Sequence, residues 1–137
     1  MSTFTLEIAD ATHDERIDAV GAFVGRDSSG AFGLLAGHER MITVLVPGLA
    51  RLRLAGGGRE YLAVTGGVLH FADNRLHIAT RRYLRDPDYG RISTLLKEQL
   101  AIEEQELSAV RESLHRLEGE MLRRLWTLGR DAEAMPR

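Results

Sequence analysis

Glycine is spread unevenly along this chain, and this asymmetry limits the folds open to it more than any other feature. Of the fourteen glycines in 137 residues, eleven fall within the first 67 residues. Short apolar segments between glycine-rich breaks are typical of antiparallel strands, whereas a glycine-poor stretch of Leu, Glu, Gln, Arg and Ala favours helix. The composition changes near Asp86-Pro87-Asp88. We therefore predict a strand-rich domain over residues 1–85 and a helical tail over residues 86–137.

Alternation between apolar and polar residues predicts the strands of the first domain. It recurs in residues 4–9, 49–54 and 75–79, as expected for strands with one buried face. The run Gly56-Gly57-Gly58 predicts a hairpin between two of them, and Asp73-Asn74 predicts another turn. About eight to ten short strands fit the domain, so we expect an α+β protein that begins with a β-sandwich.

A seven-residue repeat organises the tail. Leu107, Leu114, Met121 and Leu128 are spaced by seven, which predicts a helix with one apolar face for a partner helix. The apolar stripe is interrupted at Glu103-Glu104-Gln105-Glu106, so we predict an α-helical hairpin that turns there. Neither glycine nor proline occurs between residues 91 and 118, and one continuous helix is the alternative.

Overall composition excludes several classes of protein. The formal net charge is −2, which argues against nucleic-acid binding, and the lack of cysteine excludes disulfides and thiolate catalysis. The uncharged stretch over residues 41–50 is too short to cross a bilayer. No signal peptide is visible at the N-terminus, so we expect a cytoplasmic chain, or one peripheral to a larger assembly.

No residue pattern predicts catalysis or a metal site. The five histidines show no helical pair with zinc-ligand spacing, and His70 and His77 are expected to be solvent-facing neighbours on adjacent strands. Gly56–Gly58 lacks the Lys-Ser/Thr pair and helix of a phosphate loop. These motifs therefore predict structural roles.

Four segments resemble, in order and spacing, those of one known family. They are residues 30–38 (GAFGLLAGH), 45–49 (LVPGL), 61–69 (YLAVTGGVL) and 73–78 (DNRLHI). Together with the helical tail they resemble the epsilon subunit of F-type ATP synthases, over roughly residues 4–128. Two departures from the family pattern are Ala36 in place of proline and Glu39-Arg40 in place of Ala-Pro.

This resemblance implies a non-catalytic rotor subunit of the central stalk. In the family the sandwich contacts the gamma subunit and the membrane ring, while the helical tail restrains ATP hydrolysis by the alpha and beta catalytic subunits. The implied location is the cytoplasmic side of the cell membrane, without insertion into the bilayer. The partner-binding residues it implies are Gly37, His38, Glu39, Arg40, Arg116, Arg123, Arg124 and Trp126.

The start of the tail is similar to a family motif, I/L-D-x-x-R-A, that binds ATP in some members. Asp88 and Arg91 keep the motif's spacing, but Pro87 precedes and Ile92 follows them. We predict no cofactor and keep ATP at Asp88 and Arg91 as the alternative. Residues 82–86 look more like the divergent, sodium-translocating branch of these synthases.

Other interpretations stay open beside this one. The tail arginines are equally consistent with a solvated helix face balanced by nearby glutamates, and Trp126 with ordinary packing. A β-sandwich ligand sensor that signals through a coiled-coil tail is the alternative function. A small hydrolase is a weaker one, because no paired carboxylates or Ser/His arrangement is spaced for it.

Overall fold

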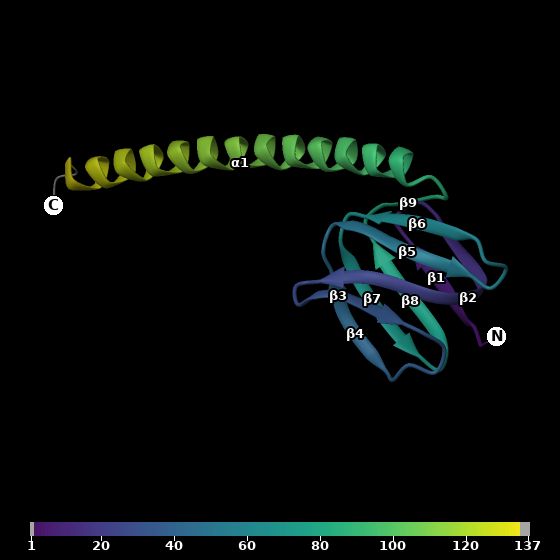
Figure 1. Ribbon diagram of the computed structural model, residues 1–137. Helices are drawn as coiled ribbons and strands as arrows, with labels where there is room; N and C mark the ends of the chain where they lie inside the picture. Colours follow the sequence, from purple (N-terminus) through teal and green to yellow (C-terminus); the bar gives the residue numbers. More distant parts are fainter. Residues whose placement is uncertain (1, 135–137) are drawn as a thin grey trace. The chain divides into compact units, whose positions relative to one another are not determined.

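The computed structural model describes residues 2–134, which form nine strands followed by one helix (Figure 1). The nine strands agree with the eight to ten predicted. Their bounds are β1 Phe4–Ala9, β2 Asp14–Asp27, β3 Gly30–Leu34, β4 Met41–Leu45, β5 Gly48–Leu54, β6 Arg59–Val64, β7 Gly67–Ala72, β8 Arg75–Thr80 and β9 Tyr83–Asp86. The helix is α1, Tyr89–Ala134.

Strand β2 joins the two layers of the sandwich. The hydrogen-bonded order is β1-β8-β7-β4-β2-β5-β6-β9, with β3 added beside β2 and a further pairing between β1 and β2. The first half of β2 pairs with β1, and its second half pairs with β3 and β5. The ladder is irregular between Val20 and Ala22, next to Ala19, which has a positive φ of 57°. Such a bulge bends a strand, so one 14-residue strand can serve both layers.

The predicted alternation fills the space between the layers. Phe4, Leu6 and Ile8 of β1 are buried, and so is Leu52 of β5. Phe4 meets Phe71 of β7 edge to face, with ring centroids 5.5 Å apart. Burying side chains of this size is the main stabilising contribution to a domain of this kind. The predicted hairpin at Gly56–Gly58 is confirmed, because it connects the paired strands β5 and β6.

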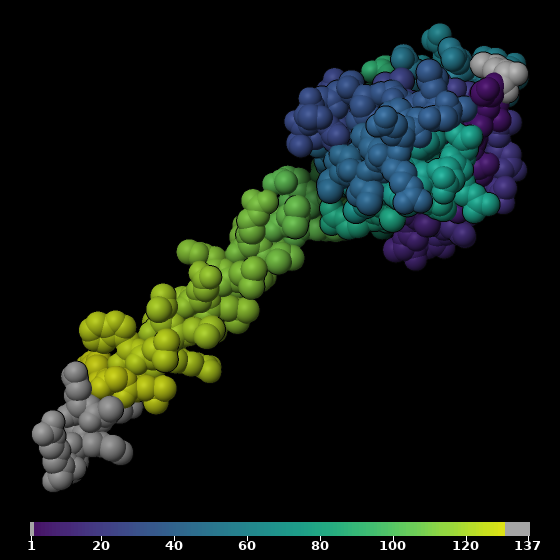
Figure 2. All heavy atoms as spheres, turned by 90° about the horizontal axis from the view of Figure 1, so that it is seen from below, coloured from purple at the N-terminus to yellow at the C-terminus, as the bar shows by residue number. Residues whose placement is uncertain are grey.

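The tail is a single helix, so the predicted helical hairpin is wrong. Helix α1 runs through Glu103-Glu104-Gln105-Glu106 without a turn, and no second helix lies beside it among residues 2–134 (Figure 2). Glu and Gln are good helix formers, and nothing in this run terminates a helix. Its 46 residues correspond to a length of about 69 Å at a rise of 1.5 Å per residue.

The chain divides into two compact units, Met1–Glu98 and Gln99 onward. The first unit therefore contains the sandwich and the first turns of α1, where Ile92 and Leu96 are buried. The second unit, as far as it is described, is helix alone. Here the apolar side chains of the seven-residue repeat are exposed, among them Leu107, Leu114 and Leu128.

Candidate functional site

The loop between β3 and β4 carries four of the residues expected to bind partners. Gly37 has a φ of +81°, a left-handed conformation that glycine adopts without strain. Its N–H donates to Oδ1 of Asn74 over 2.6 Å, and the His38 N–H donates to the Leu35 carbonyl over 3.1 Å. The structure thus brings Gly37, His38, Glu39 and Arg40 together in one exposed loop.

The β7–β8 turn fixes this loop in place. Its central residues, Asp73 and Asn74, have φ values of 51° and 57°, the left-handed pair that a type I′ hairpin turn requires. The Asn74 backbone carbonyl also accepts a hydrogen bond from the Thr5 N–H. The Asp73 carboxylate lies 3.7 Å from the Arg40 guanidinium. The loop is therefore tied to the turn that connects the paired strands β7 and β8.

His38 is oriented by two neighbours. Its Nδ1 lies 2.8 Å from the Glu39 carbonyl, and its ring meets Phe71 edge to face at 5.8 Å. Phe71 belongs to the buried core, so the imidazole is anchored on one side and exposed on the other. A plain loop contact and a partner contact both fit this position.

An exposed apolar surface on β4 and β7 was missed by the sequence analysis. Its members, Ile42, Val44 and Val68, are 73%, 65% and 48% exposed. Val44 and Val68 are directly paired across the strands, and Ile42 follows the loop after only one intervening residue. The signal was the uncharged run from residue 41, where both faces of one strand are apolar. A strand that is apolar on both faces is expected to meet a second partner.

His70 and His77 lie on the same outer face as this apolar surface. They are directly paired across β7 and β8, with stacked rings 6.2 Å apart, as the sequence predicted. His77 Nδ1 also lies 3.2 Å from Oε2 of Glu7 on β1. Among the described residues, no cluster of three His, Asp or Glu side chains has the arrangement of a metal site.

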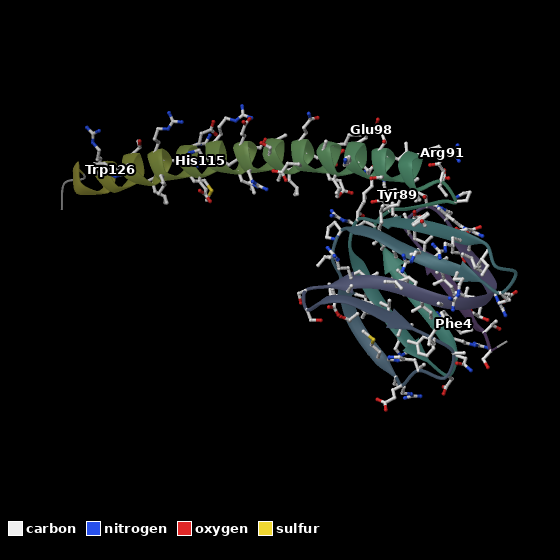
Figure 3. The ribbon with its side chains drawn as sticks, viewed as in Figure 1. Phe4, Tyr89, Arg91, Glu98, His115 and Trp126 are labelled. Atoms are coloured by element: carbon white, nitrogen blue, oxygen red, sulfur yellow. The ribbon has the colours of Figure 1, made fainter. Side chains whose placement is uncertain are left out.

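The candidate nucleotide-binding residues lie at the start of α1: Asp88 directly precedes its first residue, and Arg91, labelled in Figure 3, lies in its first turn. Oδ1 of Asp88 accepts the Arg91 backbone N–H over 3.0 Å, which caps the helix. The Arg91 guanidinium donates two hydrogen bonds to Asp86, at 2.6 and 2.9 Å. These hydrogen bonds hold the pKa of Asp86 below its usual value. Both candidates are thus engaged in ordering the junction between β9 and α1.

The remaining candidates lie on the second unit, far along the sequence from the loop. Arg116 and Arg123 are seven residues apart on α1, and Arg124 follows; all three are exposed. Trp126 is 73% exposed and is labelled in Figure 3 near the end of α1. On the same helix Leu114, Leu117 and other apolar side chains are also more than half exposed. This part of α1 therefore presents cationic and apolar groups together.

No described helix is both long enough and apolar enough to cross a membrane. The sandwich presents an ordered loop and an exposed apolar surface, and the second unit presents exposed apolar and cationic side chains.

Comparison with known proteins gives a consistent result for the sandwich. The family model described as ATP synthase, Delta/Epsilon chain, beta-sandwich domain matches residues 3–86. ATP synthase epsilon chain 2 of Cereibacter sphaeroides is 32% identical over 122 residues, covering 88% of this chain and 82% of the relative. The ATP synthase epsilon chain of a Psychrobacter species is 33% identical over 69 residues, half of each chain.

Solved structures show the same architecture. A chain in the Euglena gracilis mitochondrial ATP synthase (OSCP/F1/c-ring) superimposes with a TM-score of 0.54 at 26% identity, covering 70% of this chain and 62% of that one. A chain from the central stalk and c-ring of the Tetrahymena thermophila mitochondrial ATP synthase gives a TM-score of 0.52. Its identity is 15%, with 61% and 66% of the two chains covered, so it supports the fold alone.

Proposed function

The chain belongs to the delta/epsilon chain family of ATP synthases, and we propose that it works as the epsilon subunit of the central stalk. It is a non-catalytic subunit, and its task is to couple ion flow through the membrane ring to ATP synthesis through its contact surfaces. One observation carries this function: the family match spans the whole sandwich, and an epsilon chain aligns with 88% of the sequence.

The sandwich is the proposed binding partner of the gamma subunit and the ring. Support comes from the fixed loop Gly37–Arg40 and the adjoining apolar residues Ile42, Val44 and Val68. Exposed β-branched side chains on a rigid, paired surface bury apolar area on docking with little loss of conformational freedom. In this proposal the subunit lies peripheral to the cell membrane on its cytoplasmic side, as part of the complex.

The helical tail is the proposed brake on ATP hydrolysis. Arg116, Arg123 and Arg124 are exposed on α1. In this proposal they meet an acidic segment of the beta catalytic subunits, and the exposed Trp126 supplies an aromatic anchor beside them. The exposed apolar side chains of α1 support this role, because a helix with such a face gains stability when a partner covers it. We propose that residues 1–85 serve coupling and that residues 86–137 serve regulation.

Asp88 and Arg91 have a structural role in this proposal. The cap and the double hydrogen bond to Asp86 occupy their polar atoms, so a nucleotide would have to displace these contacts. The tail then acts without a cofactor, and ATP at these residues stays the alternative. The sodium-translocating branch stays a prediction, since the relatives named above carry no statement of the ion.

The test is ATP hydrolysis by the matching catalytic head with no addition, the full chain, or a chain ending at Glu98. Ending at Glu98 preserves β9 together with the buried Ile92 and Leu96, so the first unit keeps its packing. We expect both versions to bind gamma and only the full chain to slow hydrolysis. A triple variant with Arg116, Arg123 and Arg124 changed to Glu should bind gamma and lose the inhibition.

The outcomes separate the two roles. If both versions bind and neither slows hydrolysis, the coupling role stands and the brake is refuted. If neither binds gamma, the central-stalk role is refuted, and the β-sandwich ligand sensor becomes the better explanation.

A further inference from the structure

A cavity of about 460 Å³ opens on the outer face of the sandwich, on the opposite layer from the Ile42 surface. It lies over β2, β5 and β6 and reaches the first residue of α1, all within the unit Met1–Glu98. Two arginines and two tyrosines line it: Arg26, Arg51, Tyr61 and Tyr89. None of the roles proposed above uses this cavity.

The two guanidinium groups are available for a ligand. Within residues 2–134, neither Arg26 nor Arg51 has an ion pair or a side-chain hydrogen bond to another residue. No lining residue of the cavity carries a carboxylate. Asp86, which pairs with Tyr61 across β6 and β9, is held by Arg91. The cavity is therefore cationic and lacks an internal counter-charge.

Strand register adds positive charge beside the cavity. Arg53 and Arg59 are directly paired across β5 and β6, two positions along the ladder from the pair formed by Arg51 and Tyr61. Like charges placed opposite each other on paired strands destabilise a sheet. Neither Arg53 nor Arg59 lines the cavity, so this pair only raises the positive potential outside it.

The two tyrosines, Tyr61 and Tyr89, form an aromatic border of the cavity. Their rings meet edge to face, with centroids 5.4 Å apart and an interplanar angle of 70°. Tyr61 comes from β6 and Tyr89 from α1, so they are 28 positions apart in the sequence and meet only through the fold. Arginine is the side chain best suited to bind phosphate, because its planar group donates two parallel hydrogen bonds.

We propose that this cavity binds a phosphate group, held by Arg26 and Arg51 and bordered by Tyr61 and Tyr89. The proposal does not depend on the stalk function, since it follows from the lining residues and their register. Because Tyr89 is the first residue of α1, the bound group joins the sandwich to the start of the helix. The phosphate belongs either to an inorganic polyphosphate or to a nucleotide.

Isothermal titration calorimetry of the full chain tests this, with pyrophosphate as the probe and inorganic phosphate and ADP as further arms. Arg26→Gln and Arg51→Gln should each weaken pyrophosphate binding about tenfold or more, because each removes charge-assisted hydrogen bonds. Arg53→Gln is the matched control, since it removes the same charge from the same strand outside the lining residues. We expect it to weaken binding less than about threefold.

The ADP arm identifies the source of the phosphate. Tighter binding of ADP than of pyrophosphate, with loss of that advantage in Tyr89→Ala, supports a nucleotide; equal binding supports an inorganic ligand. The proposal is overturned if pyrophosphate gives no saturable binding, or if Arg53→Gln weakens it as much as Arg51→Gln. Far-UV circular dichroism of every variant checks that the exposed substitutions leave the fold intact.

Discussion

The two units of this chain differ in the exposure of their large apolar side chains. In the sandwich, large residues such as Phe23 and Leu52 are completely buried. Along α1 beyond Glu98, Leu117 and Leu128 are 54% and 64% exposed although they belong to a regular repeat. The sandwich is therefore stabilised by contacts within the chain, whereas the helix depends on local propensity and on any partner that covers its apolar face.

This difference in exposure fits the assignment of constant contacts to the sandwich and of regulation to the helix. A rigid, self-supporting unit is suited to constant contacts such as those proposed for gamma and the ring. A helix whose apolar groups are exposed gains free energy only when it docks, so docking can depend on the state of the catalytic subunits. A helix that was already stabilised by the sandwich could not respond in that way.

The same substitution in both units gives the sharpest test of this contrast. Leu52→Ala should lower the free energy of unfolding by about 2–5 kcal/mol, because it leaves a cavity in the core. Leu117→Ala should change it by less than about 0.5 kcal/mol, since its side chain is already exposed. Urea unfolding of the full chain measures both, with near-ultraviolet circular dichroism of the tyrosines reporting on the sandwich and the signal at 222 nm reporting on the helix. An equal loss from Leu117→Ala would refute the contrast.

Glycine-to-alanine changes should have opposite signs in the two units. Gly67 has a φ of +150°, and an added Cβ would lie 2.2 Å from the Ala79 carbonyl oxygen, so Gly67→Ala should destabilise the sandwich by about 1–3 kcal/mol. Gly119 lies in α1, and an added Cβ meets nothing within 4 Å. Gly119→Ala should therefore stabilise the helix by about 0.5–1 kcal/mol.

Thermal unfolding of both variants, followed at 222 nm for the helix and by tyrosine signals for the sandwich, provides the measurement. The tyrosines all lie in the first unit, which makes this separation possible. A loss of helix stability in Gly119→Ala would mean that the helix face around residue 119 is packed against something in the free chain.

Sequence predicted the sandwich well because its signals are local. Residues 4–9 and 75–79 alternate with period two, and Gly56–Gly58 marks a turn, so strands and a hairpin follow from neighbouring residues alone. The long bent strand β2 was not predicted, because its bulge at Ala19 depends on which strands pair with each half. Its conformation is set by tertiary contacts.

The prediction of a helical hairpin in the tail was wrong for a different physical reason. The acidic run at Glu103–Glu106 was interpreted as a turn because it interrupts the apolar stripe, yet these residues favour helix and no breaker is present. Of the candidate sites, the loop at His38 is predicted from the family resemblance. The cluster of Arg51, Tyr61 and Tyr89 was missed because it forms only in the fold. Strand register pairs Arg51 with Tyr61, and a ring contact from α1 adds Tyr89.

The helix cap tests the junction between β9 and α1. Asp88→Ala removes the acceptor of the Arg91 N–H and should destabilise the start of α1 by about 1 kcal/mol. Amide hydrogen exchange at Arg91 and Ile92, whose N–H groups both bond to Asp88, should then become about fivefold faster. Asp88→Ser is the control, because a serine hydroxyl can accept the same hydrogen bond. If the serine variant exchanges as fast as the alanine variant, the capping assignment is wrong.

The smallest expected effect concerns acid stability of the sandwich alone. Desolvation raises the pKa of Asp10, but hydrogen bonds from Thr12 and His13 outweigh it and lower the pKa to about 2, against an ordinary value of 3.8. A carboxyl whose pKa is lowered by folding adds stability above its unfolded pKa and loses it as the pH falls through the folded value. This contribution should be complete above about pH 4 and absent below about pH 2.

Asp10→Asn should therefore flatten the pH dependence of the free energy of unfolding between pH 4 and 2. Urea titrations of the sandwich signal at several pH values measure the slope. Glu39→Gln, which changes an exposed carboxylate in the loop beside His38, is the control. If the helix signal shifts with the Asp10 variant to the same extent, the two units unfold together and their stabilities are coupled. If only the sandwich signal shifts, the helix is energetically separate in the free chain, as its exposed apolar face requires.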